Sequence, residues 1–542
     1  MFRNAVLAVV TALIFSMPVT AVHARSQIIH DAETTRMQAI FGEQWAADDK
    51  EVAKKLAALE AKFGKKPNIV YILADDIGYT ELGSYGGGKI RGAPTESLDQ
   101  MAAEGMRFLS FYSEVECSPS RAALLTGRHA FRSGVNNAVW PGMKGDGLSG
   151  EEKSLATILS SAGYYTGHFG KWHLGGEDEY HPTNHGFDEA EWSEGNPPWW
   201  VFNKNARGTD DVGGFTQRGG ILAHPGPEGF PYDTGGVMRA RKGEEPQIVY
   251  ELTMEKYNPY DTEAADRAID FIKRRAKTDQ PFFLNFWGKG NHFWGAHPDF
   301  RDTPAQTNTA AQMVEHDYNV GRILQTLTEL GIAENTLVIW SSDNGPHYAF
   351  HPHGGYSLLP GGKGETLEGG VRVPSIAWWP GMIEAGQDPL DIVSISDWFT
   401  TMTRVGGAMD MIPRDRVIDG VDQTGLLLLG EGKSRRDHLF YYAKGKLEAV
   451  RKDQVKMYMK PKNPDLKFVE VINLYHDPAE RFGNEVQNGL WAGAGLGKLV
   501  QEHLKQIEEY PVRKLQPVWP DFDRSFDPEA TPVYKPQKQA DW

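Results

Sequence analysis

Pro67-Asn68-Ile69-Val70-Tyr71-Ile72-Leu73-Ala74-Asp75-Asp76 is the part of the chain that says most about its fold. Six consecutive apolar residues follow the Pro-Asn pair, and an unbroken run of this length is typical of a strand buried on both faces. Such strands occur in sheets that carry helices on both sides. The run therefore predicts an α/β protein with two carboxylates at the end of its first strand.

Strand and helix patterns alternate after this run. Apolar residues recur at helical spacing over 264–272 and again over 320–330, where Gly331 provides a stop. A short apolar run follows each helix, at 282–287 and at 337–340. This order predicts an α/β sheet flanked by helices.

One further helix start is indicated by its side chains. Ser149 and Glu152 have the spacing of a capping box, in which each side chain bonds the backbone N–H of the other residue. Leu155, Ile158 and Leu159 follow at helical spacing. We therefore expect Ser149 to begin a helix.

Smaller units border the α/β region. The segment before Pro67 is polar with apolar residues at helical spacing, which predicts a helix on the outside of the main domain. Short alternating segments at 437–442 and 456–458 predict a smaller antiparallel unit near the end. The divisions we expect are a signal peptide (1–24), a helical extension (25–66), a catalytic domain (67–430) and a C-terminal subdomain with a tail (431–542).

The start of the chain indicates the cellular location of the protein, and its charge bears on the partners it can bind. Arg3, an apolar run over 5–17 and small residues up to Ala24 are typical of a secretory signal peptide. That run is too short to cross a membrane, and no later one reaches the ~20 residues of a span. We therefore expect a periplasmic or secreted protein without a membrane span. Its 57 basic and 72 acidic residues argue against a nucleic-acid partner, and an anionic substrate would need a local positive site.

Two acidic clusters follow predicted strands. Asp75 and Asp76 come after the first strand, and Asp343-Asn344 follows the strand at 337–340. Ligands of open α/β sheets bind at the carboxyl ends of the strands. Adjacent buried carboxylates repel each other unless a cation lies between them. Because these candidate ligands are all oxygen donors, they favour calcium or magnesium over zinc.

The single cysteine begins the run Cys117-Ser118-Pro119-Ser120-Arg121-Ala122-Ala123-Leu124-Leu125-Thr126-Gly127-Arg128. Pro119 restricts the backbone, and the apolar stretch that closes at Gly127 predicts a helix with Cys117 near its N-terminus. A helix N-terminus and the permanent charge of Arg121 both favour anions. The run therefore predicts an anion site that contains a reactive group.

This run resembles the sulfatase signature, in which Cys-x-Pro-Ser-Arg is followed by Thr-Gly-Arg. The resemblance implies an alkaline-phosphatase-like mixed sheet flanked by helices, followed by a small C-terminal α+β subdomain that carries an antiparallel sheet. It also implies that a formylglycine-generating maturation enzyme converts Cys117 to formylglycine. Both acidic clusters resemble the metal motifs of this family. The implied cofactor is one Ca²⁺, with Mg²⁺ as the alternative, and its implied ligands are Asp75, Asp76, residue 117, Asp343 and Asn344.

Three further blocks resemble the family. Lys171 and His173 lie in a Gly-Lys-Trp-His block, Lys363 lies in a glycine-rich loop, and His292 follows a predicted strand with an asparagine in place of the usual proline. The resemblance implies that the two lysines hold sulfate oxygens and that His173 takes a proton from the hydrated aldehyde. His292, or else Lys363, would protonate the leaving alcohol, while Arg121 steadies the diol and the carboxylates.

Three functions fit the sequence. The leading one is a sulfatase that hydrolyses aryl, sugar or alkyl sulfates through the formylglycine diol. The second is a formylglycine-dependent phosphonate or phosphate ester hydrolase. The third is a secreted ring-binding protein with an inactive site, for which the aromatic residues Trp192, Trp199, Trp200 and Phe202 would provide the stacking surface. We expect residues 197–255 to form a substrate-facing insertion.

Overall fold

A computed structural model describes most of the chain between Gln27 and Lys514. The described residues are 27–139, 145–195, 236–251, 254–290, 296–347, 354–460, 469–481 and 486–514. The expected signal peptide, His292, most of the expected insertion and the end of the tail lie outside them. Within the described residues, none of the helices has the length and apolar character that a membrane crossing demands.

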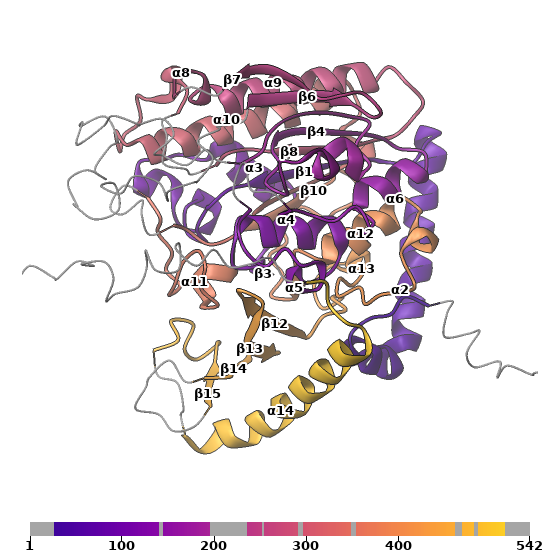
Figure 1. The fold of residues 1–542 in the computed structure, drawn as a ribbon, viewed down its shortest axis with the longest axis vertical. Coiled ribbons are helices and arrows are strands. Elements are labelled where there is room, and N and C mark those ends of the chain that lie inside the picture. Colours follow the sequence, from indigo (N-terminus) through magenta and orange to yellow (C-terminus); the bar gives the residue numbers. More distant parts are fainter. Residues whose placement is uncertain are drawn as a thin grey trace, which may run out of the picture.

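A mixed sheet of nine strands forms the centre of the described part (Figure 1). Its order is β2 (Met106–Phe108), β10 (Ser375–Trp378), β9 (Thr336–Ser342), β1 (Asn68–Ala74), β8 (Phe282–Trp287), β4 (Tyr165–Lys171), β5 (Glu189–Ser193), β6 (Gly236–Arg241) and β7 (Gln247–Glu251). The five strands from β9 to β5 are parallel, and every other pair of neighbours is antiparallel. This arrangement confirms the predicted mixed α/β sheet.

Helices cover both faces of the sheet because its strands are apolar on both sides. Val70 and Ile72 of β1 point into one core and Ile69, Tyr71 and Leu73 into the other, as the two-residue period of a strand requires. The first core is covered by α3 (Glu96–Glu104), α9 (Tyr260–Arg275) and α10 (Asn308–Glu329). The second is covered by α4 (Cys117–Thr126), α6 (Leu155–Ser161), α12 (Asp397–Val405) and α13 (Thr424–Leu429), and the predicted N-terminal helix α2 (Ala32–Phe63) packs on the outside of α13.

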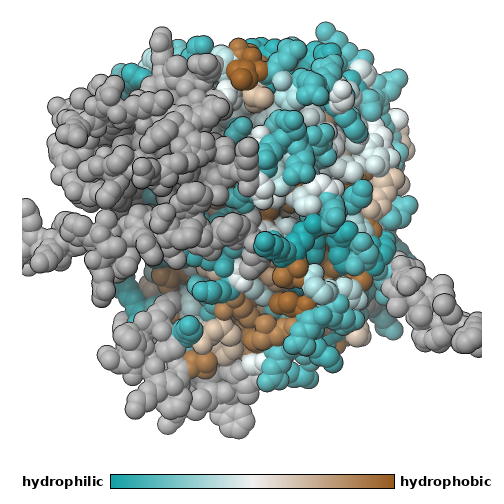
Figure 2. All heavy atoms as spheres, in the orientation of Figure 1, coloured by the Kyte–Doolittle hydropathy of each residue, from teal (hydrophilic) through white to brown (hydrophobic). Residues whose placement is uncertain are grey.

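A small antiparallel sheet follows the main domain, as predicted. Its strands are β12 (His438–Ala443), β13 (Lys446–Lys452), β14 (Val455–Tyr458) and β15 (Glu470–Asn473), and α14 (Val486–Glu509) packs on them. The other side of this sheet rests on α11 (Glu368–Val371) and on the strand pair β3 (Ser110–Tyr112) and β11 (Ile392–Ser394). Figure 2 shows hydrophobic residues in the lower part of the molecule, where Figure 1 places this sheet and α14.

The predicted capping box is wrong. Helix α6 begins at Leu155, and its cap is Ser154, whose hydroxyl accepts the backbone N–H of Thr157. Glu152 lies in a turn, and its buried carboxylate accepts a hydrogen bond from Arg128 Nη1 at 2.5 Å. Glu152 therefore bonds Arg128, which lies 24 residues away in the sequence, and does not cap α6.

Candidate active site

The two predicted acidic clusters meet at the carboxyl edge of the main sheet. Ala74 is the register partner of Ser342 across the parallel pair β1 and β9, so the residues that follow both strands emerge side by side. The backbone N–H of Asp343 donates to Ala74 O at 3.0 Å, and the N–H of Asp76 donates to Asp343 Oδ1 at 3.2 Å. Parallel pairing alone therefore brings together carboxylates that lie 267 residues apart.

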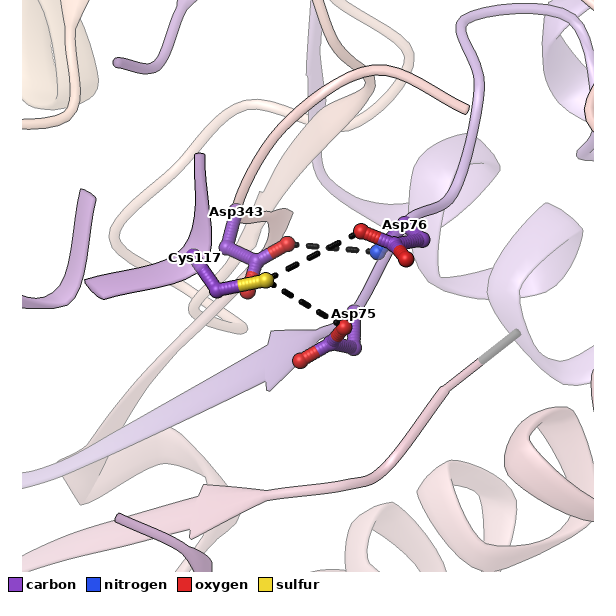
Figure 3. A group of neighbouring side chains, drawn as sticks. All are labelled: Asp75, Asp76, Cys117 and Asp343. Atoms are coloured by element: carbon purple, nitrogen blue, oxygen red, sulfur yellow. Dashed lines mark hydrogen bonds between the residues drawn. The ribbon is translucent and has the colours of Figure 1, made fainter. Parts of the chain in front are cut away.

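Cys117 is the first residue of α4 and points into this cluster (Figure 3). Its Sγ lies 3.5 Å from Asp75 Oδ1 and 3.8 Å from Asp76 Oδ1. The helix ends as predicted at Gly127, where φ is 67° and the N–H bonds Ala123 O. Burial raises the pKa of the thiol well above its usual value, and the charges of neighbouring carboxylates add to this effect.

Three cations face the three carboxylates. The buried guanidinium of Arg121 donates through Nη2 to Asp75 Oδ2 at 2.8 Å and to Asp343 Oδ2 at 3.0 Å. Lys171, the last residue of β4, also bonds Asp75. Lys363 Nζ lies 2.6 Å from Asp76 Oδ1 and 3.0 Å from Cys117 Sγ. The three formal positive charges match the three negative charges of the aspartates, as buried ions require.

His173 follows Lys171 by two residues and belongs to the same site. Burial lowers the pKa of its imidazole well below the usual value, and the charges of Lys171 and Arg121 lower it further. These surroundings therefore favour the neutral form of the ring. His173 and Asp76 both have positive φ, 61° and 58°, a conformation that side chains other than glycine seldom adopt. Strain of this kind collects at functional sites.

The donor set fits a divalent cation. Ligand atoms of Asp75, Asp76, Cys117 and Asp343 all lie within 4.8 Å of one another. Asp76 Oδ2 and Asn344 Oδ1 are buried, and neither has a hydrogen-bond partner among the described residues. An unbonded buried oxygen is costly, and a hard cation bound by oxygens would complete both atoms. The oxygen donors of this site are therefore suited to Ca²⁺ or Mg²⁺. They belong to Asp75, Asp76, Asp343 and Asn344.

The structure brings together nine of the ten residues predicted from the sequence. They are Asp75, Asp76, Cys117, Arg121, Lys171, His173, Asp343, Asn344 and Lys363. His292 lies outside the described residues. The segment that leads to it does reach the site, because a Cβ on Gly290 would meet the backbone oxygen of Asp75 at 2.3 Å.

Sequence reasoning missed two ionisable residues beside the site. Glu116 precedes Cys117, and burial raises the pKa of its carboxyl while the charge of Lys363 opposes that rise. His347 lies three residues after Asn344, and burial followed by the charge of Lys363 lowers the pKa of its ring to about 4. Proximity to the motifs along the chain was the only available signal, and it says nothing about which way a side chain points.

A site of this charge pattern suits the transfer of an anionic group, and comparison with known proteins identifies the group. A family model described as Sulfatase matches residues 67–408. N-acetylgalactosamine-6-sulfatase of the dog, Canis lupus familiaris, is 38% identical over 405 residues, which cover 72% of this chain and 71% of the relative. Human arylsulfatase A is 36% identical over 391 residues, which cover 70% of this chain and 71% of the relative.

Structural similarity agrees with these sequence matches. A sulfatase from Pseudoalteromonas sp., PsFucS1, superposes with a TM-score of 0.77 at 32% identity, covering 87% of this chain and 96% of that protein. The chain belongs to the sulfatase family. It is a sulfuric ester hydrolase, which confirms the class of enzyme predicted from the sequence.

Proposed function

We propose that this sulfatase removes sulfate from sulfated sugars, with formylglycine at position 117 as nucleophile and Ca²⁺ as cofactor. The carrying observation is the convergence of Cys117 Sγ with three buried aspartates inside a ring of two lysines and an arginine. A sugar substrate is supported by two relatives named N-acetylgalactosamine-6-sulfatase, which match 72% and 75% of the chain. Aryl and alkyl sulfates are the alternatives that a substrate panel would separate.

The nucleophile and the cation have complementary tasks. After conversion to formylglycine, residue 117 would supply one hydroxyl of the hydrated aldehyde as the nucleophile, and loss of a proton from the second hydroxyl would expel sulfate. Asp75, Asp76, Asp343 and Asn344 would hold the cation, which would supply positive charge to the reacting oxygens. Sulfatase barriers demand several such contributions, because a single well-placed electrostatic donor supplies only about 3–4 kcal/mol.

The side chains around residue 117 then have distinct roles. Lys363, whose Nζ lies 3.0 Å from Cys117 Sγ, holds a sulfate oxygen, and Lys171, which bonds Asp75, holds another. Arg121 bonds Asp75 and Asp343, so it keeps the carboxylates in place. The neutral ring of His173 receives the proton of the second hydroxyl. His292 donates a proton to the leaving alcohol, with Lys363 as the alternative donor.

The proposal also covers export, maturation and the division of the chain into domains. Residues 1–24 direct export to the periplasm or the outside of the cell, where the mature enzyme meets its substrate. A maturation enzyme modifies Cys117. Residues 67–430 form the catalytic domain, and 431–542 form the C-terminal subdomain with its tail.

Two measurements test the proposal. Peptide mass spectrometry across residue 117 of the active protein should detect the aldehyde or its hydrate. Rates should be highest on an N-acetylgalactosamine 6-sulfate ester and lower on aryl and alkyl sulfates, phosphate monoesters and phosphonate monoesters. An intact thiol in fully active enzyme would refute the nucleophile, and a faster phosphonate reaction would support the alternative hydrolase.

A further inference from the structure

The turn that carries Lys363 is held from three directions. The backbone N–H of Lys363 donates to Pro346 O at 3.0 Å, two residues beyond Asn344. The N–H of Gly364 donates to Val115 O at 2.8 Å, two residues before Cys117. The third support comes from the C-terminal sheet, which Figure 1 shows directly below α11 at the end of this turn. We name residues 360–371 the lysine turn.

A fully buried lysine of the C-terminal sheet makes this third contact. Lys456, in β14, donates from Nζ to the backbone carbonyl of Thr366 at 2.7 Å and to Glu368 Oε1 at 3.0 Å. Its Nζ also lies 3.1 Å from Glu480 Oε1. The side chains of Lys456, Glu368 and Glu480 are all 0% exposed. Thr366 is three residues from Lys363, so Lys456 bonds the lysine turn close to its functional side chain.

Both glutamates are themselves bonded at several points. Glu368 Oε2 accepts the hydroxyl of Tyr112 at 2.6 Å, and the Glu368 N–H donates to Glu480 Oε2 at 2.9 Å. Tyr458 OH donates to Glu480 Oε1 at 2.5 Å. Glu480 has a φ of 48°, so the chain after β15 accepts an unfavourable conformation where this contact is made. The contacts form a closed network across the junction between the two units.

A buried ion network is not needed for packing alone. Well-packed apolar side chains of similar volume are often as stabilising as a buried ion pair, because burying charges carries a desolvation cost. What the network adds is direction, since a hydrogen bond to a specific carbonyl fixes the backbone more closely than apolar contact does. The carbonyl fixed here belongs to the lysine turn, and Lys363 Nζ stands 3.0 Å from Cys117 Sγ.

We propose that Lys456 is a positioning residue through which the C-terminal sheet sets the place of Lys363 beside residue 117. The proposal rests on the proposed function, in which Lys363 holds a sulfate oxygen. Lys456 touches neither substrate nor the reacting atoms, and it acts only through the lysine turn. The C-terminal subdomain thereby contributes to turnover as well as to folding.

A double-mutant cycle on the full-length, formylglycine-bearing enzyme tests this role. Lys456→Met alone should lower kcat/KM by about 10- to 100-fold, because displacement of a catalytic group by about 1 Å has costs of this order. Lys363→Ala should lower it at least as much. In the Lys363→Ala background, Lys456→Met should have less than ~2-fold further effect, since the group it positions is already gone.

Two other results separate the hypotheses. If the two losses multiply, Lys456 does not act through Lys363 and the positioning role is overturned. If Lys363→Ala itself leaves kcat/KM unchanged, the proposed role of Lys363 fails instead. Glu480→Gln is a milder second variant for the case in which Lys456→Met does not fold, because it keeps an acceptor for the Glu368 N–H. It should lower kcat/KM by ~3- to 10-fold, and this loss should also vanish in the Lys363→Ala background.

His438→Gln is the matched control. His438 is a buried cation-forming residue of the same sheet, but it forms ion pairs with Asp31 and Asp437, away from the lysine turn. It should lower the midpoint of thermal unfolding and leave kcat/KM within ~2-fold. An equal loss of kcat/KM in this variant would overturn the proposal, because any weakening of the sheet would then be sufficient.

Discussion

Two buried aspartates of this molecule differ in how completely their charge is satisfied. Asp397, at the start of α12, accepts hydrogen bonds on both oxygens from Arg436 and from two backbone N–H groups at 2.8 and 2.9 Å. Asp76 is equally buried, and its Oδ1 accepts from Lys363 at 2.6 Å and from Asn344 at 2.7 Å. Its Oδ2 has no hydrogen-bond partner among the described residues.

The difference separates a carboxylate that supports the fold from one that serves the reaction. A buried charge with every lone pair bonded has recovered its desolvation cost and needs nothing more. A buried charge with an open oxygen retains an unmet interaction, which a bound ion or substrate can meet. Burial is common to both residues, so incomplete bonding is the observation that identifies the functional one.

The largest effect should come from removing the Sγ atom of Cys117, which lies among the three aspartates of the site. Cys117→Ala leaves no side chain to become formylglycine, so sulfatase activity should fall by at least ~10⁴-fold, as is usual when a nucleophile is lost. The variant should still fold, because a small buried side chain is replaced by another. Rates on an aryl sulfate and a thermal melt measure both quantities. A variant that kept a tenth of the activity would contradict the proposed nucleophile.

Removal of the cation tests whether the unbonded oxygen of Asp76 serves to bind a metal ion. Chelation should lower activity by ~10³-fold, because a bound metal contributes several kcal/mol to stabilising charge in the transition state. Added Ca²⁺ should restore activity and raise the unfolding midpoint, corresponding to about 2.7 kcal/mol at a concentration 100 times Kd. Mg²⁺ added in parallel shows which ion the site prefers.

Asp76→Asn and Asp397→Asn form the matched pair for this experiment. The first should abolish the Ca²⁺-dependent rise in the unfolding midpoint, because it removes a ligand charge. The second should preserve the rise, since Asp397 bonds only protein groups. An equal response of the two variants would mean that the open oxygen of Asp76 does not bind the ion.

The Asp397–Arg436 pair should show the opposite result, because a change there should lower stability and leave activity unchanged. Asp397→Asn leaves Arg436 buried without its counter-ion, a change that typically costs about 3–5 kcal/mol of stability. The kcat/KM of the protein that remains folded should stay within ~2-fold of wild type, because neither residue reaches the site. Urea unfolding followed by fluorescence measures the first quantity and initial rates measure the second. A large loss of kcat/KM at unchanged stability would contradict the assignment.

The sequence predicts the open site better than the closed networks, for a physical reason. Asp75, Asp76, Asp343 and Asn344 follow apolar runs, and parallel pairing brings the ends of such runs to one edge. Lys456 and Glu368 are 88 residues apart, and no periodicity relates them. Contacts made by single long side chains across a domain junction depend on tertiary packing, which local patterns do not encode.

The failed capping box has the same origin. The spacing of Ser149 and Glu152 suits a local bond, but Arg128 reaches the glutamate from 24 residues away and provides a stronger, charge-assisted partner. Ser154 then caps α6 on its own, through the N–H of Thr157. Local spacing therefore indicated that a helix was near, and long-range electrostatics decided where it began.

The smallest effect we predict concerns a second closed network, and it is a dependence of stability on pH. His438 lies between two carboxylates, with Nε2 3.0 Å from Asp31 Oδ1 and Nδ1 3.0 Å from Asp437 Oδ1. Burial opposes the charged ring, but the charge and hydrogen bond of Asp31 prevail and raise the pKa of His438 to about 9 from 6.5. This difference corresponds to about 3 kcal/mol of stability, and that value covers the contacts of His438 with Asp31 and Asp437 together.

Because the folded pKa of His438 is the higher one, the contribution is complete below pH 6.5 and is lost as the pH rises through 9. The pKa of Asp31 is held well below 3.8 by His438 against the effect of burial, so the same contacts weaken again in strong acid. Unfolding midpoints of the wild type and His438→Gln should therefore converge between pH 6.5 and 9. Parallel curves across that window would mean that the histidine is not charged in the folded protein. Glu33 of α2 and Lys452 of β13 would still join the helix to the C-terminal sheet through an ion pair.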